Sequence, residues 1–211
     1  MASSRDPSTL AIKRAVLTWI SAEVKDVRPI VVSGPSGVGK GTLIQMLQDA
    51  HPGVFTKTVS HTTRQPRAGE MEGSTYFYIT ESEFKSLILQ NVFVEYTQFS
   101  GNYYGTSKST ITHQTEKGLV VLLEIDIEGV KQMRQRSIIN ARYIFIKPPS
   151  FEELASRLQG RSTETEMSIQ KRMQQAKAEL QQAETLGLYD KIIVNEDLAT
   201  AYKELENFIY G

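Results

Sequence analysis

The 211-residue sequence contains no cysteine, so it forms no disulfide and holds no zinc through thiolates. Its three histidines, His51, His61 and His113, are too scattered to replace such a site. Lysine plus arginine balance aspartate plus glutamate, 24 against 24, which leaves no excess positive charge to bind a nucleic-acid backbone. No run approaches the roughly 18 consecutive apolar residues of a transmembrane helix. We therefore expect neither a nucleic-acid partner nor a membrane partner.

Strand-like and helix-like patterns alternate at both ends of the chain. Hydrophobic residues make up 40% and charged residues 23%, which is ordinary for a globular domain. Short apolar runs predict buried strands at residues 29–33, 119–125, 142–146 and 191–194. Helical spacing and capping residues predict helices at 42–50, 151–158, 165–186 and 197–209. This alternation predicts the α/β class, with a parallel sheet wrapped by helices.

The middle of the chain has a different pattern. Aromatic, strand-like segments at 75–79 and 92–99 lie close together in sequence, and Thr80 and Glu83 form a capping box that begins a helix ending at Leu89. These features predict a small mixed lobe inserted into the α/β core. The expected organisation is an N-terminal extension, helical or disordered, over residues 1–28 and a domain over 29–211, with its core at 29–59 and 107–211 and its lobe at 60–106.

The first 22 residues carry a basic bias. Arg5, Lys13 and Arg14 occur there with a single acid, Asp6, and apolar residues recur at roughly helical spacing. A mitochondrial presequence has this composition. We favour the simpler interpretation, a surface helix or a disordered lead-in, and we expect a cytoplasmic protein.

A glycine-rich segment lies between the first predicted strand and the first predicted helix. It reads GPSGVGK, from Gly34 to Lys40, and fits the pattern G-x-x-x-x-G-K. Glycines let several backbone N–H groups converge on phosphate oxygens, and the helix N-terminus adds positive potential. Gly41 follows the lysine where serine or threonine is usual, so the nearest hydroxyl for a magnesium ion is that of Thr42. The predicted phosphate-binding residues are Gly34, Pro35, Ser36, Gly37, Val38, Gly39, Lys40, Gly41 and Thr42.

Two arginines lie three residues apart in the segment SHTTRQPRAGE. Arg64 and Arg67 flank Pro66, and a guanidinium group binds phosphate through two parallel hydrogen bonds. The two side chains could converge on one phosphate. Paired arginines on a loop are also commonly solvated, so this segment alone leaves both interpretations open.

Five segments together resemble the guanylate kinase family: GPSGVGK, SHTTRQPRAGE, FSGNYYGTS, LEIDIEG and GRSTETE, in this order and spacing. The resemblance covers about residues 29–210. It implies a P-loop fold with an inserted GMP-binding lobe and a helical lid at about residues 157–172. The implied reaction transfers a phosphoryl group from ATP to GMP, giving ADP and GDP, in guanine nucleotide metabolism.

The resemblance also implies a GMP site. Arg64, Arg67, Tyr76 and Tyr104 would hold the GMP phosphate, whereas Ser60, Glu95, Thr106 and Asp126 would face guanine or its approach. A carboxylate at Glu95, within a strand, matches the N1–H and N2–H₂ donors of guanine and would lack a partner opposite adenine. Without the resemblance, Glu95 would be taken for a glutamate of an edge strand facing water.

Glu124 and Asp126 end the strongest predicted strand, where open α/β sheets bind ligands. Their two-residue spacing points both side chains to one side. Within the implied family they would orient guanine or hold magnesium through water; otherwise they would cap the next helix. Family members often carry aspartate at the first of these positions, so the role of Glu124 is less well defined.

The lid implied by the resemblance supplies further cations. Arg157, Arg161 and Arg172 would join Lys40 and Arg64 in stabilising charge on the transferred group, with Mg²⁺ accompanying ATP and held at Thr42, partly through water.

The alternative function is a non-catalytic, guanylate-kinase-like scaffold domain that binds phosphorylated partner peptides. Scaffold relatives typically have a degraded P-loop, and many carry proline at the position of Ser60. Because Lys40, Ser60 and Arg161 are all present, we favour the enzyme, acting as a monomer on ATP and GMP, although a phosphopeptide partner remains compatible with the sequence.

Overall fold

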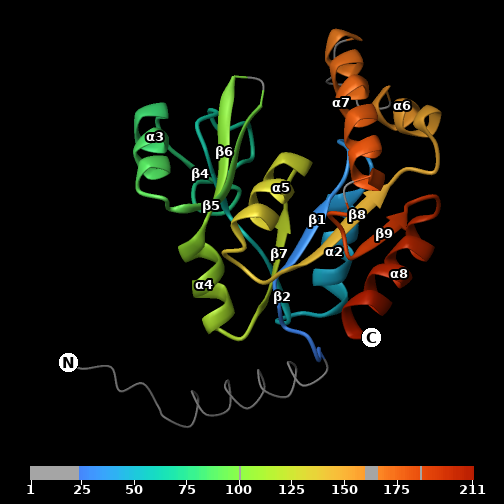
Figure 1. Ribbon diagram of the computed structural model, residues 1–211, viewed down its shortest axis with the longest axis horizontal. Helices are drawn as coiled ribbons and strands as arrows, with labels where there is room; N and C mark the ends of the chain where they lie inside the picture. Colours follow the sequence, from blue (N-terminus) through green and yellow to red (C-terminus); the bar gives the residue numbers. More distant parts are fainter. Residues whose placement is uncertain (1–23, 100, 160–165, 186) are drawn as a thin grey trace.

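The structure, a computed structural model, describes residues 24–99, 101–159, 166–185 and 187–211 (Figure 1). Most of the predicted N-terminal extension, Arg161 and the centre of the predicted lid therefore lie outside the described residues. Within the described part of the chain, no helix is both long enough and apolar enough to cross a membrane.

Five parallel strands form the larger sheet, in the order β2-β7-β1-β8-β9. The central strands are apolar and β-branched, as a sheet covered on both faces requires. Four of the strands confirm the sequence-based prediction, and β2 was not predicted. The strands are β1 (Ile30–Ser33), β2 (Phe55–Lys57), β7 (Val120–Glu124), β8 (Arg142–Lys147) and β9 (Lys191–Val194).

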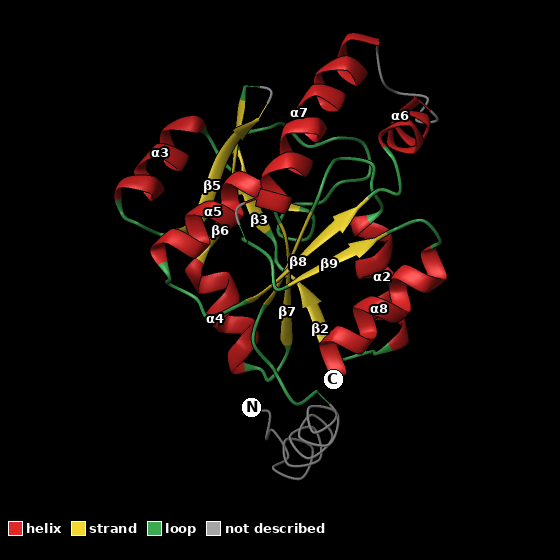
Figure 2. Ribbon diagram, turned by 45° about the vertical axis from the view of Figure 1, so that its right-hand side comes forward, coloured by secondary structure: helices red, strands yellow, loops and turns green. Residues whose placement is uncertain are grey.

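Helices cover both faces of this sheet (Figures 1 and 2). On one face, α2 (Lys40–Ala50), α6 (Phe151–Gln159), α7 (Glu166–Thr185) and α8 (Leu198–Tyr210) bury a core that includes Ile30, Leu122 and Ile144. On the other face, α4 (Lys108–Glu116) and α5 (Ile127–Arg136) pack on Val31 and Leu123. The predicted α/β architecture is therefore confirmed.

A separate mixed sheet of four strands has the order β4-β3-β6-β5. Its strands are β3 (Ser60–Thr62), β4 (Tyr76–Tyr78), β5 (Phe93–Phe99) and β6 (Asn102–Ser107), with β3 parallel to β4 and antiparallel to β6. Helix α3 (Glu81–Leu89) packs on this sheet through Phe84, which stacks on Phe93. The capping box of Thr80 and Glu83 is present as predicted.

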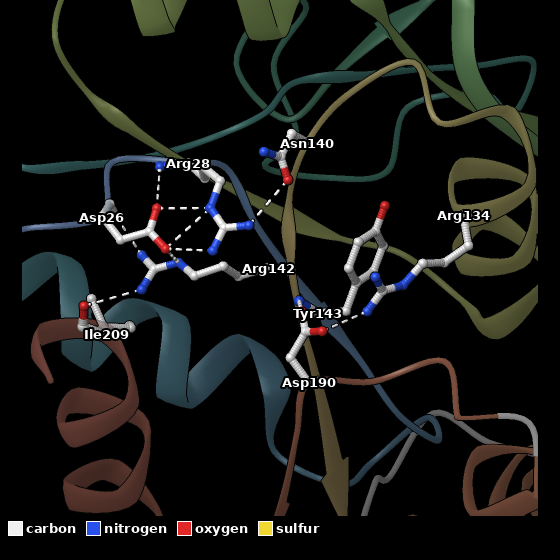
Figure 3. Close-up of polar contacts among 8 residues, drawn as sticks. All are labelled: Asp26, Arg28, Arg134, Asn140, Arg142, Tyr143, Asp190 and Ile209. Atoms are coloured by element: carbon white, nitrogen blue, oxygen red, sulfur yellow. Dashed lines mark hydrogen bonds and ion pairs between the residues drawn. The ribbon is translucent and has the colours of Figure 1, made fainter.

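A buried arginine ties three segments together at the edge of the large sheet where β8 begins (Figure 3). Arg142 is 5% exposed and donates to the carbonyl oxygens of Ile209 in α8 (3.1 Å) and Asp26 (2.6 Å). Asp26 in turn forms an ion pair with Arg28, which also bonds Asn140. This cluster lies at the amino ends of the parallel strands. It is therefore remote from their carboxyl ends, where open α/β sheets bind ligands.

Candidate active site

A cavity of about 410 Å³ opens at the carboxyl ends of the large-sheet strands. Its walls come from the glycine-rich loop, the ends of β2 and β7, the small sheet, and helix α7. Its lining includes ten of the residues predicted from the sequence: Gly34, Ser36, Lys40, Ser60, Tyr76, Glu95, Tyr104, Glu124, Asp126 and Arg172.

The glycine-rich loop joins β1 to α2 in a conformation that requires glycine. Gly34 has φ +143°, and a Cβ there would lie 2.2 Å from the carbonyl oxygen of Ile146; Gly39 caps α2 with φ +100°. Lys40 begins the helix, two residues before its predicted start, and its Nζ donates to the carbonyl oxygens of Gly34 (2.6 Å) and Pro35 (3.0 Å). The lysine is thus held over the loop whose N–H groups would bind phosphate.

Glu95 is 4% exposed and lines the cavity. A bulge aims it there, because Phe93 pairs with Ser107 whereas Glu95 pairs with Thr106, so two residues of β5 advance against one of β6. Thr106 is buried behind the carboxylate, donates to it, and lies 3.0 Å from Ser60 Oγ through its own hydroxyl. Burial raises the pKa of Glu95 to about 7, and the charge of Asp126 adds to the effect.

The charges of two lysines act on Glu124. Glu124 Oε2 is 2.7 Å from Lys57 Nζ. A Cβ built on Gly41, the residue after Lys40, would lie 3.9 Å from the same oxygen. Burial opposes ionisation, but the charges of Lys57 and Lys40 outweigh it and lower the pKa of Glu124. Asp126 lines the cavity and also caps α5, accepting from the Gly129 N–H at 2.9 Å.

Two tyrosines form the cavity wall on the side of the small sheet, and an arginine lies beside one of them. The rings of Tyr76 and Tyr104 lie 6.0 Å apart, and the Arg64 guanidinium lies 5.5 Å from the Tyr76 ring. Glu70 fixes Arg64 through an ion pair of 2.8 Å, and this pairing lowers the pKa of Glu70 to about 2. Arg67 is exposed, and its backbone N–H donates to Glu70. Neither arginine lines the cavity itself.

Helix α7 brings a cation and a carboxylate to the cavity. Arg172 Nη1 donates to Ser36 Oγ at 2.5 Å, which joins α7 to the glycine-rich loop. Glu179, seven residues later and 6% exposed, lines the same cavity, and its pKa is raised by burial. Arg157 lies outside the cavity, where it bonds Glu153 and the Asn195 carbonyl oxygen.

Sequence reasoning missed Lys57 and Glu179. Lys57 belongs to a three-residue strand that is too short to show a period, so nothing indicated which way its side chain points. Glu179 had a signal that went unused: a spacing of seven residues places it on the same face of a helix as Arg172. Thr42 is exposed in the first turn of α2 and does not line the cavity.

A glycine-rich loop between a parallel strand and a helix, with its lysine at the carboxyl edge of the sheet, defines a P-loop nucleotide-binding protein. The family model "Guanylate kinase" matches residues 26–211. The chain is 46% identical over 180 residues to a guanylate kinase of Schizosaccharomyces pombe (strain 972 / ATCC 24843), covering 85% of this chain and 89% of that one. A guanylate kinase of Synechococcus sp. (strain CC9311) is 46% identical over 179 residues, covering 85% and 92%.

A solved structure agrees with these relatives. The crystal structure of guanylate kinase from Anaplasma phagocytophilum superposes with a TM-score of 0.65 at 30% identity, covering 88% of this chain and 85% of that one. The chain belongs to the guanylate kinase family.

Proposed function

We propose that this protein transfers the terminal phosphoryl group of ATP to GMP, giving ADP and GDP. One observation carries the proposal: a single cavity is lined by the P-loop lysine, Lys40, and by a buried carboxylate, Glu95, that suits guanine. Its volume of about 410 Å³ is in the range of small-molecule sites. The names of the relatives support the same reaction.

In the proposed guanine site, Glu95 accepts from the N1–H and N2–H₂ groups of the base. Thr106 holds this carboxylate, and its hydroxyl lies 3.0 Å from that of Ser60. Both hydroxyls would contact the base edge, and Asp126 would face the base or its approach. Adenine lacks these donors, so a buried carboxylate facing it would lose its partners. Such a site rejects the analogue by up to about 10⁴–10⁵.

The proposed GMP phosphate site uses Arg64, Arg67, Tyr76 and Tyr104. The ion pair with Glu70 presents the Arg64 guanidinium beside Tyr76, so its orientation is set in advance. The tyrosine hydroxyls donate to phosphate while their rings form the wall.

The proposed ATP site is the loop Gly34–Thr42 with Lys40. No side chain acts as a nucleophile, because an oxygen of the GMP phosphate attacks the γ-phosphorus. The protein positions the two nucleotides in line, excludes water and neutralises charge on the transferred group. In the proposed mechanism the lid, residues 157–172, and the lobe, residues 60–106, close around the substrates. Closure brings three lid arginines, Arg157, Arg161 and Arg172, to the transferred group, where they neutralise its remaining negative charge.

We propose that Mg²⁺ accompanies ATP beside the P-loop. The described residues hold no cluster of three or more His, Cys, Asp or Glu side chains suited to a metal, so the ion would depend mainly on phosphate and water oxygens. The Thr42 hydroxyl and, through water, the Glu124 carboxylate would supply the protein's oxygens. When bound, the ion neutralises charge on the ATP phosphates.

An assay of ADP release tests the proposal. The protein is supplied with ATP, Mg²⁺ and either GMP, AMP, UMP or CMP, and ADP is measured by a coupled reaction. We expect turnover with GMP that exceeds turnover with the other three by at least about 10³. Equal turnover with AMP would remove the guanine assignment. Because one chain supplies all the lining residues, we expect a monomer to be active, which light scattering at assay concentration checks.

A further inference from the structure

Helix α5 is fastened to the outer edge of the small sheet by one glutamine. Gln132 Oε1 accepts from the Tyr96 N–H at 3.2 Å, and its Nε2 donates to the Tyr96 carbonyl oxygen at 2.7 Å. Among the described strands β5 pairs only with β6, so no strand of the described chain lies beside the backbone of Tyr96 on its other side. The side-chain amide of Gln132 takes the place of the missing strand.

The same helix touches the residue before Tyr96. A Cβ on Gly129 would lie 2.9 Å from Glu95 Oε2 and 3.3 Å from its Cγ, a separation that only glycine allows. Gly129 is buried, and its own N–H is the donor to Asp126. The Glu95 carboxylate therefore lies directly against the backbone of α5 at Gly129.

These contacts link two carboxylates that belong to different sheets. Asp126 begins α5, which follows β7 of the large sheet, whereas Glu95 lies on β5 of the small sheet. Residues 126, 129 and 132 are spaced three apart, so one side of the first turns of α5 carries the cap, the contact with Glu95 and the bond to Tyr96. The bulge next to Glu95 interrupts the local pairing with β6, and the contacts from α5 support the strand at this point.

We propose that Gln132 and Gly129 are positioning residues that hold Glu95 in place and thereby set the affinity and selectivity for the guanine base. This inference rests on the proposed role of Glu95. Gln132 contacts no substrate itself; it fixes the strand on which the acceptor lies, while Gly129 sets how closely the carboxylate approaches α5. Loss of either contact lets Glu95 shift relative to Asp126, and hydrogen bonds to two donors on one planar base tolerate little displacement.

The first test is Gln132→Met, which keeps the length of the side chain and removes both hydrogen bonds. We expect KM for GMP to rise about tenfold, with KM for ATP and kcat within about twofold of the parent. The preference for GMP over AMP, measured as the ratio of kcat/KM, should fall by a similar factor. Gln135→Met is the matched control, because Gln135 is exposed on the same helix.

The second test is Gly129→Ala, which displaces Glu95 directly. Alanine favours a helix over glycine, so the helix itself gains stability. We expect KM for GMP to rise about tenfold. The melting temperature should not fall with it, because the gain in helix stability offsets the displacement of Glu95. This variant also decides the question if Gln132→Met does not fold.

Each outcome bears on one claim. If the parent protein shows no turnover with GMP, the proposed function fails. If the parent is active and both folded variants keep its KM for GMP, the positioning role is wrong and Gln132 serves only the strand edge. An equal rise in KM for ATP would also overturn it, since a general distortion would explain both.

Discussion

Lys57 Nζ and Glu124 Oε2 lie 2.7 Å apart, so an ion pair joins β2 to the end of β7 in the wall of the active-site cavity. The pair is asymmetric: the Lys57 side chain is 48% exposed, whereas that of Glu124 is 28% exposed. Glu124 also senses the charge of Lys40 in the P-loop. The charges of two lysines, one of them in the P-loop, therefore act on this carboxylate in the cavity wall.

Removing the cation of this pair should slow phosphoryl transfer. In Lys57→Met, Glu124 loses one of the two positive charges that offset its burial, so its pKa rises. We expect kcat to fall about tenfold, and the loss to grow as pH is lowered, because Glu124 then takes up a proton more readily than in the parent. Lys57→Arg, which keeps the charge, is the control. A pH profile identical to that of the parent would contradict a role for the pair.

A second prediction separates the enzyme from a phosphopeptide-binding scaffold. Ser60→Pro removes the hydroxyl that bonds Thr106 and the backbone N–H of the first residue of β3, and it fixes φ near −65°. We expect most GMP turnover to be lost, while the fold and the two arginines of the SHTTRQPRAGE segment remain.

The comparison for that prediction is Ser60→Ala, which removes the hydroxyl alone and should lose less activity. Steady-state turnover is measured beside a thermal melt of each protein. Undiminished turnover in folded Ser60→Pro would show that neither the hydroxyl nor flexibility at this strand matters for catalysis.

Arg142 should matter for stability and not for activity. Its guanidinium is buried at the edge of the sheet remote from the cavity and bonds two carbonyl oxygens there (Figure 3). Arg142→Met leaves these acceptors unpaired and should lower the free energy of unfolding by about 2–4 kcal/mol, as urea titration would measure. KM for both nucleotides should stay unchanged in the folded protein. A shift in KM for GMP would indicate that this cluster communicates with the site.

The buried Glu95 side chain should lower the free energy of unfolding at neutral pH. Its pKa is raised from 4.5 to about 7 in the folded state, so the folded protein binds more protons than the unfolded chain between these values. Stability contributed through this group therefore falls as pH rises from about 4.5 to 7. We expect Glu95→Gln to be more stable than the parent at pH 8, by up to about 3 kcal/mol, with the difference absent at pH 4. If the parent and Glu95→Gln had the same melting temperature at pH 8 as well as at pH 4, this prediction would be wrong.

Regular periodicity and spacing predicted the core well. The P-loop required only local signals, since strand, glycines, lysine and helix are adjacent in the chain, and β1, β7, β8 and β9 are continuous apolar runs. Helices α4 and α5 were given no predicted bounds, because most of their positions are polar and each begins at a single cap, Ser107 or Asp126, without a capping box. The alternative prediction that this strand end caps the next helix is confirmed for Asp126.

The cavity depends on contacts that no local pattern encodes. The face on which Glu95 lies follows from a bulge, because strict alternation along β5 would place the glutamate with Phe93 on the face that packs against α3. The pairing of Lys57 with Glu124 joins residues 67 positions apart. Resemblance to a family supplied the role of Glu95, but the supports around it, Gly129 and Gln132, became visible only when β5 and α5 were placed side by side.

The most direct measurement compares the parent with Glu95→Gln in steady-state kinetics for both nucleotides. The substitution replaces one acceptor oxygen with an amine that opposes the donors of guanine. We expect a fall in kcat/KM for GMP equivalent to about 2–4 kcal/mol, with KM for ATP nearly unchanged. An equal loss for ATP, or no loss for GMP, would contradict the claim that this buried carboxylate recognises the guanine base.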